Sequence, residues 1–221
     1  MIHCIGSLLD SNSLNAVLRE LDGLEFRDGR VTAGWAARQV KNNLQATSTG
    51  GNYARVTQVV QQKLSVNEVL LAAALPRQFS PLLISRYEPG MRYGAHVDDA
   101  FMGTPPMRTD LSFTLFLSRP EDYAGGELVL EQTDGEHEYK LAAGSLVLYP
   151  STTLHRVEPV ESGRRTVVVG WIQSLCADPR MREILFDLSR VRVTLAGQEN
   201  AAGLVALLNK SYSNLLRLAS S

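Results

Sequence analysis

Hydrophobic residues near the start of the chain recur at the spacing of an amphipathic helix. The apolar stripe consists of Leu14, Val17, Leu18 and Leu21. Ser11 and Ser13 stand near its start as potential N-caps, because a serine hydroxyl can accept a hydrogen bond from a free amide at a helix start. The pattern predicts a helix over this segment that packs one face on a core.

A second helical region is predicted from Tyr53 to Leu75, and Pro76 marks its end. Within it, Ser65 and Glu68 have the spacing of a capping box, which predicts a fresh helix start. The polar, glycine-containing stretch 47–52 lies between the two helical regions and is expected to be a connecting loop.

From Phe79 to about Gln173 the pattern changes to short runs rich in β-branched and aromatic residues, separated by turn residues. The clearest predicted strands are Leu82 to Tyr87, Leu111 to Leu117, Glu127 to Leu130, Ser145 to Tyr149 and Thr166 to Ile172. Short strands with short turns are typical of an antiparallel sandwich or barrel such as a jelly roll. We therefore predict an α+β fold with helices before and after a jelly-roll core.

The last part of the chain returns to helical spacing. Asp178 is a predicted cap and Pro179 occupies the favoured first helical position. Two apolar stripes follow: Met181, Ile184, Leu185 and Leu188, then Leu204, Leu207, Leu208, Tyr212, Leu215 and Leu216. They predict a helical hairpin docked on the β core or on another subunit, so a homodimer is one expectation. The expected organisation is a domain over 1–176, with its β core at about 79–176, and a helical extension over 177–221.

The composition is that of a soluble globular protein, with 44% apolar and 20% charged residues. The formal net charge of −1 argues against nucleic acid and anionic membranes as partners, because proteins bind these through an excess of Lys and Arg. No secretory signal or spanning segment is predicted, so a cytoplasmic location is expected. The two cysteines, Cys4 and Cys176, match no metal-binding pattern and are expected to be reduced and buried.

Candidate metal ligands are few, because the chain has only four histidines. His96 and Asp98 are two residues apart, so an extended segment would place both side chains on one face. His155 follows the apolar run 145–150 near the predicted end of a core strand and could supply a third ligand. Two histidines and one carboxylate on one octahedral face leave three positions open, as in non-haem Fe(II) oxygenases.

Arg165 lies ten residues after His155. A continuous strand would separate the two by roughly 33 Å, so the chain must double back if they share a pocket. Pro159, Ser162 and Gly163 predict a turn that would bring them onto neighbouring antiparallel strands. An inward guanidinium there would offer a bidentate site for a carboxylate. Alternation would turn either Arg164 or Arg165 to solvent, depending on the register.

The residues around the candidate ligands form a longer motif. It runs Tyr87-Glu88-Pro89-Gly90-Met91-Arg92-Tyr93-Gly94-Ala95-His96-Val97-Asp98. This run resembles the prolyl 4-hydroxylase-type motif of the Fe(II)/2-oxoglutarate oxygenases. His155 and Arg165 match the distal histidine and co-substrate arginine of that motif, and the resemblance continues through residues 123–128 and 154–157. The segment 41–43, the chain length and the helical tail further resemble the bacterial PKHD-type hydroxylases, the PiuC-like iron-uptake factor group.

This resemblance implies a double-stranded β-helix, Fe(II), 2-oxoglutarate, dioxygen and L-ascorbate as a reductant. His96, Asp98 and His155 would hold the iron, while Arg165, aided by Tyr87, would bind the distal carboxylate of 2-oxoglutarate. The reaction would hydroxylate an unidentified substrate and release succinate and carbon dioxide, with a link to iron homeostasis. Related halogenases lack the carboxylate ligand, so Asp98 favours hydroxylation.

Two other function classes compete with this hydroxylase. One is a non-catalytic iron sensor or interaction module, which would not need Arg165. The other is a cupin-like dioxygenase that does not consume 2-oxoglutarate. For the weaker candidates we expect Tyr93 and Trp171 to be core residues, Asp99 to be solvated or to accept a hydrogen bond behind the ligands, and the segment 100–107 to border the substrate entrance.

Overall fold

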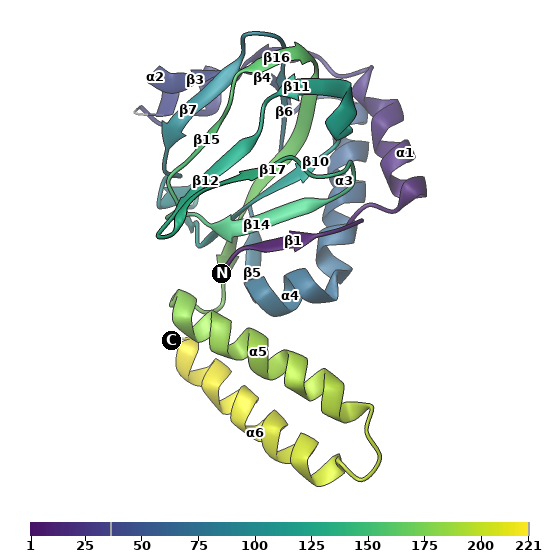
Figure 1. The fold of residues 1–221 in the computed structure, drawn as a ribbon, viewed down its shortest axis with the longest axis vertical. Helices are drawn as coiled ribbons and strands as arrows, with labels where there is room; N and C mark the ends of the chain where they lie inside the picture. The colour runs from purple at the N-terminus through teal and green to yellow at the C-terminus, as the bar shows by residue number, and fades with distance from the viewer. Residues whose placement is uncertain (36, 221) are drawn as a thin grey trace.

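Two antiparallel β-sheets face each other in the computed structural model, which describes residues 1–35 and 37–220 (Figure 1). In order, the larger sheet contains β1 (His3–Ile5), β14 (Leu146–Pro150), β10 (Leu111–Phe116), β17 (Arg165–Ser174), β6 (Leu83–Tyr87), β4 (Leu44–Ala46) and β2 (Phe26–Asp28), and β5 (Pro76–Phe79) also pairs with β17. The smaller sheet contains β13 (Gly135–Tyr139), β12 (Leu128–Gln132), β15 (His155–Val157), β7 (Arg92–His96) and β3 (Lys41–Asn42). Two further pairs are β8 (Phe101–Met102) with β9 (Met107–Arg108), and β11 (Tyr123–Gly125) with β16 (Val160–Gly163).

The central strands of the larger sheet, β14, β10 and β17, are largely apolar on both faces because both faces are covered. In β10, Phe113 and Leu115 contribute to a core beneath the helices, whereas Phe116 belongs to a second core between the sheets. The same alternation separates Leu148 from Tyr149 in β14. This double burial explains why these strands were visible in the sequence as nearly continuous apolar runs.

Three helices, α1 (Ser11–Leu21), α3 (Gly51–Val66) and α4 (Glu68–Ala74), cover the outer face of the larger sheet (Figure 1). The predicted fresh start inside the second helical region is confirmed, because α3 ends at Val66 and α4 begins at Glu68, but the capping residues of α1 and α4 differ from the predicted ones. The α1 cap is Asp10, which accepts from the Ser13 amide, and the α4 cap is Asn67, which accepts from the Leu70 amide. Asp and Asn side chains took the role expected for neighbouring serines, since all three residue types cap well.

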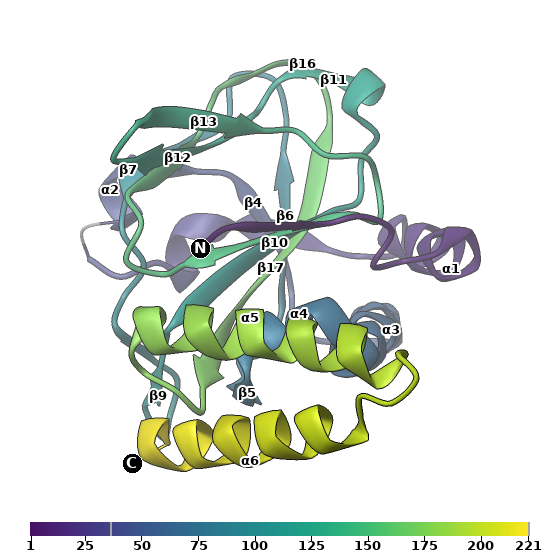
Figure 2. The same cartoon turned by 60° about the horizontal axis from the view of Figure 1, so that its bottom comes forward.

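The C-terminal hairpin of α5 (Pro179–Ala196) and α6 (Ala202–Ala219) lies below the sheets in Figure 1 and at the bottom of Figure 2. Asp178 caps α5 and Pro179 opens it, as predicted. The hairpin packs mainly on α4 through a small core in which Leu185 meets Leu75 and Cys176. It also reaches the β core, since Phe186 of α5 belongs to the core beneath the helices and its ring lies 4.6 Å from that of His3 in β1.

Several short elements were not visible in the sequence. They include β1 to β4, which lie before the predicted β core begins at residue 79 and yet belong to the two sheets. They also include the short helical segments η1 (Gly29–Thr32), α2 (Ala37–Val40) and η2 (Pro120–Asp122). Strands of two or three residues carry too little periodic pattern to be recognised. Both cysteines are free, but Cys4 is exposed rather than buried because β1 is an edge strand. Within the described residues, no helix is long and apolar enough to cross a membrane.

Candidate metal and co-substrate site

A cavity of about 470 Å³ opens between the two sheets. Its size falls in the range of roughly 300–1,000 Å³ that is usual for small-molecule sites. All five site residues expected from the sequence line it, namely Tyr87, His96, Asp98, His155 and Arg165. The fold thus brings together side chains from β6, β7, β15 and β17.

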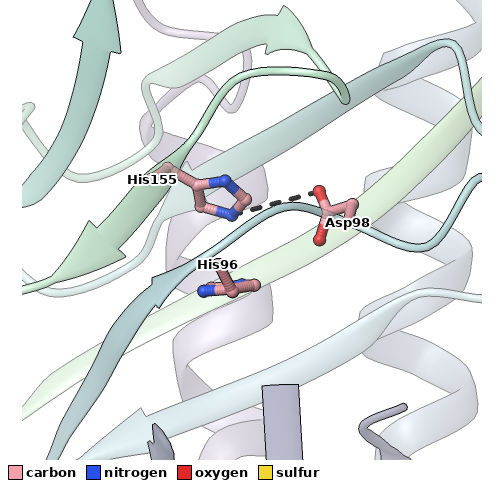
Figure 3. A group of neighbouring side chains, drawn as sticks. All are labelled: His96, Asp98 and His155. Atoms are coloured by element: carbon pink, nitrogen blue, oxygen red, sulfur yellow. Dashed lines mark ion pairs between the residues drawn. The ribbon is translucent and has the colours of Figure 1, made fainter. Parts of the chain in front are cut away.

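Three potential ligands converge on one point of this cavity (Figure 3). His96 ends β7, Asp98 follows two residues later, and His155 opens β15, where it pairs directly with His96. Their donor atoms all lie within 4.8 Å of one another, and His155 Nε2 is 4.0 Å from Asp98 Oδ2. His155 therefore begins a strand, whereas the sequence had placed it near the end of the preceding one.

Hydrogen bonds fix the orientation of each ligand. The Nδ1 atoms of His96 and His155 lie 2.8 Å and 2.9 Å from the carbonyl oxygens of Gly94 and Thr153. Since a carbonyl only accepts, each Nδ1 donates its proton there, and Nε2 is the ring nitrogen turned toward a metal. Ser112 donates to Asp98 Oδ2 at 2.6 Å. Burial and the neighbouring His155 lower the pKa of His96 to about 4, so its ring is neutral at pH 7.

Arg165 occupies the opposite wall of the cavity. It begins β17 of the larger sheet, whereas His155 lies in the smaller one, so the predicted pairing of their strands was wrong. The chain does double back, but through β16, which pairs with β11. Arg165 is only 1% exposed, and Arg164 faces solvent with a side chain 57% exposed. Alternation along β17 thus assigns the inward position to Arg165.

The Arg165 guanidinium is buried among aromatic rings without a counter-ion. Its Cζ lies 5.0 Å from the centroid of Tyr87 and 5.5 Å from that of Phe116. Its Nε has no hydrogen-bond partner, and no carboxylate of the described residues lies within 4.0 Å. Because a buried, unpaired charge is costly, this arrangement fits a site that an incoming carboxylate completes.

Gly126 holds the Arg165 stem in place. Its φ of +68° is in the left-handed region, and a Cβ there would lie 2.9 Å from Val160 and 3.1 Å from Arg165 Cδ. Gly126→Ala is expected to destabilise the fold by about 1–3 kcal/mol and to weaken binding of a carboxylate co-substrate while metal affinity is retained. Calorimetric titration and urea unfolding would measure both effects.

Gly90→Ala is the matched control for this prediction. Gly90 also has a positive φ, +83°, but a Cβ there would meet nothing within 4 Å. The Gly90→Ala variant should therefore have the strain of an alanine at positive φ but should bind the co-substrate as wild type does. Equal losses of co-substrate affinity in the two variants would contradict a role for Gly126 in placing Arg165.

Comparison with known proteins identifies the family. Residues 82–173 match the model of the 2OG-Fe(II) oxygenase superfamily. A PKHD-type hydroxylase of Synechococcus elongatus is 51% identical over 98% of both chains, and one of Rippkaea orientalis is 49% identical over the same shares. The chain belongs to the PKHD-type hydroxylases.

Solved structures support the same fold for this PKHD-type hydroxylase. A Pseudomonas putida prolyl-4-hydroxylase is 23% identical, with a TM-score of 0.53 over 78% of this chain and 92% of that one. A viral collagen prolyl hydroxylase is 18% identical, with a TM-score of 0.55 over 78% of this chain and 95% of that one. The predicted jelly-roll fold with flanking helices is therefore confirmed. The family match and the PKHD-type relatives make the chain an enzyme of the dioxygenase class.

The family implies Fe(II) and 2-oxoglutarate, and the residues present fit both groups. Two neutral imidazoles and one carboxylate are the donor set that non-haem Fe(II) oxygenases use. The unpaired guanidinium of Arg165, in the same cavity, suits one end of a dicarboxylate. The iron-sensor alternative gives no reason for this second feature.

Other residues line the cavity of the hydroxylase beside the expected ones. Tyr93 and Trp171 do so, although they were expected to be core residues, and Tyr93 stacks on His96 with ring centroids 3.7 Å apart. Asp99 is exposed, and Phe101 and Met102 also line the cavity, which agrees with the expected position of segment 100–107 beside it. Lys41, Asn43 and Gln45 were missed as lining residues. They alternate with Asn42 and Leu44 along the sequence, which places the three side chains on one face of an extended segment. A polar face of this kind usually points to solvent rather than into a cavity.

Lys41→Met is expected to stabilise the ligand-free protein at neutral pH. Burial lowers the pKa of Lys41 from 10.5 to about 8, with Asp98 and Asp28 opposing the shift. A lowered lysine pKa means that the folded state disfavours the charged form. Lys41 therefore destabilises the fold fully below about pH 8, and this destabilisation disappears as the pH rises to 10.5. This destabilisation is on the order of 3 kcal/mol.

Urea unfolding of both proteins at several pH values checks this prediction. The stability advantage of K41M over wild type should shrink between about pH 8 and pH 10.5. A K41M protein that is less stable than wild type at pH 7 would contradict the prediction and would show that Lys41 stabilises the folded protein.

Proposed function

We propose that His96, Asp98 and His155 hold Fe(II) and that Arg165 binds the C5 carboxylate of 2-oxoglutarate, with Tyr87 beside it. The enzyme would hydroxylate a primary substrate, converting 2-oxoglutarate to succinate and carbon dioxide. The observation that carries the proposal is the presence of a three-ligand cluster and a buried, unpaired guanidinium in one cavity. The family supports both halves of this assignment.

Bound Fe(II) would supply the activation of dioxygen, and the chain supplies position. Ser112 holds the Asp98 carboxylate, and Ser151 in turn lies 2.7 Å from Ser112, so the ligand cannot rotate away. Arg165 would fix the far end of 2-oxoglutarate and thereby set the distance of its keto end from the ligands. Tyr87 and Tyr149 are buried beside this path and exclude water.

The experiment that tests this function measures oxygen uptake and succinate formation together. The Fe(II)-loaded protein with 2-oxoglutarate should form one succinate for each dioxygen consumed, slowly without a primary substrate. Oxygen uptake without succinate would support the cupin-like alternative, and neither would support the sensor alternative. We also propose L-ascorbate as a reductant, which should raise the number of turnovers before inactivation.

The link to iron homeostasis is proposed on the resemblance to the iron-uptake group. Its test is physiological: deletion of the gene should alter growth or iron content when iron is limiting, and complementation by an Asp98→Ala variant should fail. Normal growth of the deletion strain at low iron would contradict this link.

We propose that residues 1–176 form the oxygenase domain and 177–221 an appended hairpin. The hairpin packs mainly through a small core of its own, with Phe186 reaching the main core, and Arg182 donates to the carbonyls of Cys176 and Ala177 at 2.7 Å and 2.9 Å. A chain ending at residue 176 is expected to unfold at a lower temperature but to retain metal binding. Loss of metal binding in a folded truncated chain would contradict this division.

A homodimer through the hairpin belongs to the same proposal. Leu204 and Leu207 of α6 are 62% and 57% exposed and would supply the contact. Light scattering of the full chain tests this, and a monomer at all concentrations would remove the suggestion.

A further inference from the structure

A polar wall closes one side of the cavity. It consists of Lys41, Asn43 and Gln45, which are only 7%, 3% and 5% exposed. The intervening Asn42 is exposed, so the extended chain through β3 and β4 turns alternate side chains inward. Apolar side chains would suit a buried face better, and their absence from these three positions points to a ligand-binding wall.

The Lys41 ammonium group lacks a counter-ion in this wall. Its Nζ donates one hydrogen bond, to Thr32 Oγ1 at 3.2 Å, and lies 5.2 Å from the ring centroid of Tyr93. An ammonium has three N–H donors, so two have no partner in the described part of the chain. No carboxylate there lies within 4.0 Å of it.

The nearby carboxylates are already engaged. Asp28 pairs with Arg30 at 2.5 Å, and Asp98 accepts from Ser112. Asp99 lies against Gly34, where a Cβ would be 2.5 Å from its Oδ2. None of them forms an ion pair with Lys41 in the described part of the chain, although Asp98 and Asp28 favour its charged form from a distance.

The co-substrate would not neutralise Lys41 either. In the proposed complex, Fe(II) and Arg165 carry three positive charges, and Asp98 with the two carboxylates of 2-oxoglutarate carries three negative ones. These groups then balance one another, and Lys41, which forms no ion pair with the exposed Asp99 of the same cavity, keeps an unpaired charge. An anionic group on the other reactant would remove this imbalance.

We propose that Lys41 binds a carboxylate of the primary substrate and so selects an anionic substrate for oxidation beside the three ligands. This assignment rests on the proposed function, because it takes the cavity to hold metal and 2-oxoglutarate already. Lys41 acts as a specificity-determining residue on the wall formed with Asn43 and Gln45. The Asn43 amide is buried with neither its nitrogen nor its oxygen hydrogen-bonded in the described part of the chain, so it is available to a polar substrate, whereas the Gln45 amide is held by Thr32 and Ser85.

A proton NMR experiment tests this with Mn(II) in place of Fe(II) and saturating 2-oxoglutarate. Bound Mn(II) broadens the signals of any molecule that exchanges into a position beside it. One sample contains a mixture of N-acetyl amino acids with free carboxylates, and the matched sample contains their amides. A blocked peptide with one internal Glu distinguishes a polypeptide side chain from a small acid as the source of the carboxylate.

Wild type should broaden one or more carboxylates at concentrations about tenfold lower than the matched amides. K41M should lose this preference and K41R should keep it. Lys63→Met is the control, since Lys63 lies on α3 and pairs with Asp10. An unfolding temperature of K41M at or above that of wild type would show that the loss is not caused by unfolding.

Two failures are distinguishable. If the methylene signals of 2-oxoglutarate broaden but no carboxylate probe does, or if K41M keeps the preference, the Lys41 assignment is overturned alone. If 2-oxoglutarate itself is not broadened in wild type, the proposed function fails, and the Lys41 assignment fails with it.

Discussion

Asp98→Ala is expected to weaken divalent-metal binding by more than about 100-fold and to abolish turnover. Residues that only support a ligand already cost 10- to 100-fold in metal affinity when they are lost, so removal of the charged ligand should cost more. The cluster has one carboxylate and two imidazoles, and the variant would leave two neutral donors for a doubly charged ion. Competition with a chromophoric chelator would measure the affinity.

Asp99→Ala is the matched control for Asp98. It removes the adjacent carboxylate, which is exposed and lines the same cavity. Its metal affinity should stay within a few-fold of wild type. Comparable losses in the two variants would mean that general negative charge, rather than ligation by Asp98, governs metal binding.

Arg165→Met is expected to weaken 2-oxoglutarate binding on the order of 100-fold or more, with metal affinity retained. Each charge-assisted hydrogen bond to a carboxylate contributes about 1.5–3 kcal/mol, and a guanidinium can make two. The 1% exposed site excludes competing water, so the full effect should be seen. Calorimetric titration of the metal-loaded variant measures it.

The fold of the Arg165 variant should survive. A methionine fills much of the same space among Tyr87 and Phe116 and removes a buried, unpaired charge. Arg164→Met is the control, because Arg164 points to solvent from the same strand end. An unchanged 2-oxoglutarate affinity in Arg165→Met would assign the co-substrate carboxylate to another residue.

Local periodicity accounts for much of what the sequence could predict. The two-residue spacing of His96 and Asp98 placed both side chains in the cavity, and alternation required one of Arg164 and Arg165 to face inward. The central strands of the larger sheet, β14, β10 and β17, were evident because burial on both faces leaves a strong apolar pattern. The ligand set and co-substrate residues came from the motif resemblance, which the site geometry accommodates.

The pairing of strands far apart in the chain could not be predicted from the sequence. Nothing local distinguishes β15 pairing with β7 from β15 pairing with β17, so His155 and Arg165 were placed on adjacent strands rather than on facing sheets. Lys41, Asn43 and Gln45 were overlooked because inward polar residues look like a solvated edge until the cavity is seen. The caps shifted by one or two residues because several neighbouring side chains could fill each position.

The most direct test of the central claim is anaerobic visible spectroscopy of the Fe(II)-loaded protein on addition of 2-oxoglutarate. Chelation of iron by the keto and carboxylate oxygens should produce a weak metal-to-ligand charge-transfer band in wild type. The band should be lost in His155→Ala and should need far more 2-oxoglutarate in Arg165→Ala. A wild-type protein with bound iron and no band at saturating 2-oxoglutarate would contradict the account and favour a metal-binding module.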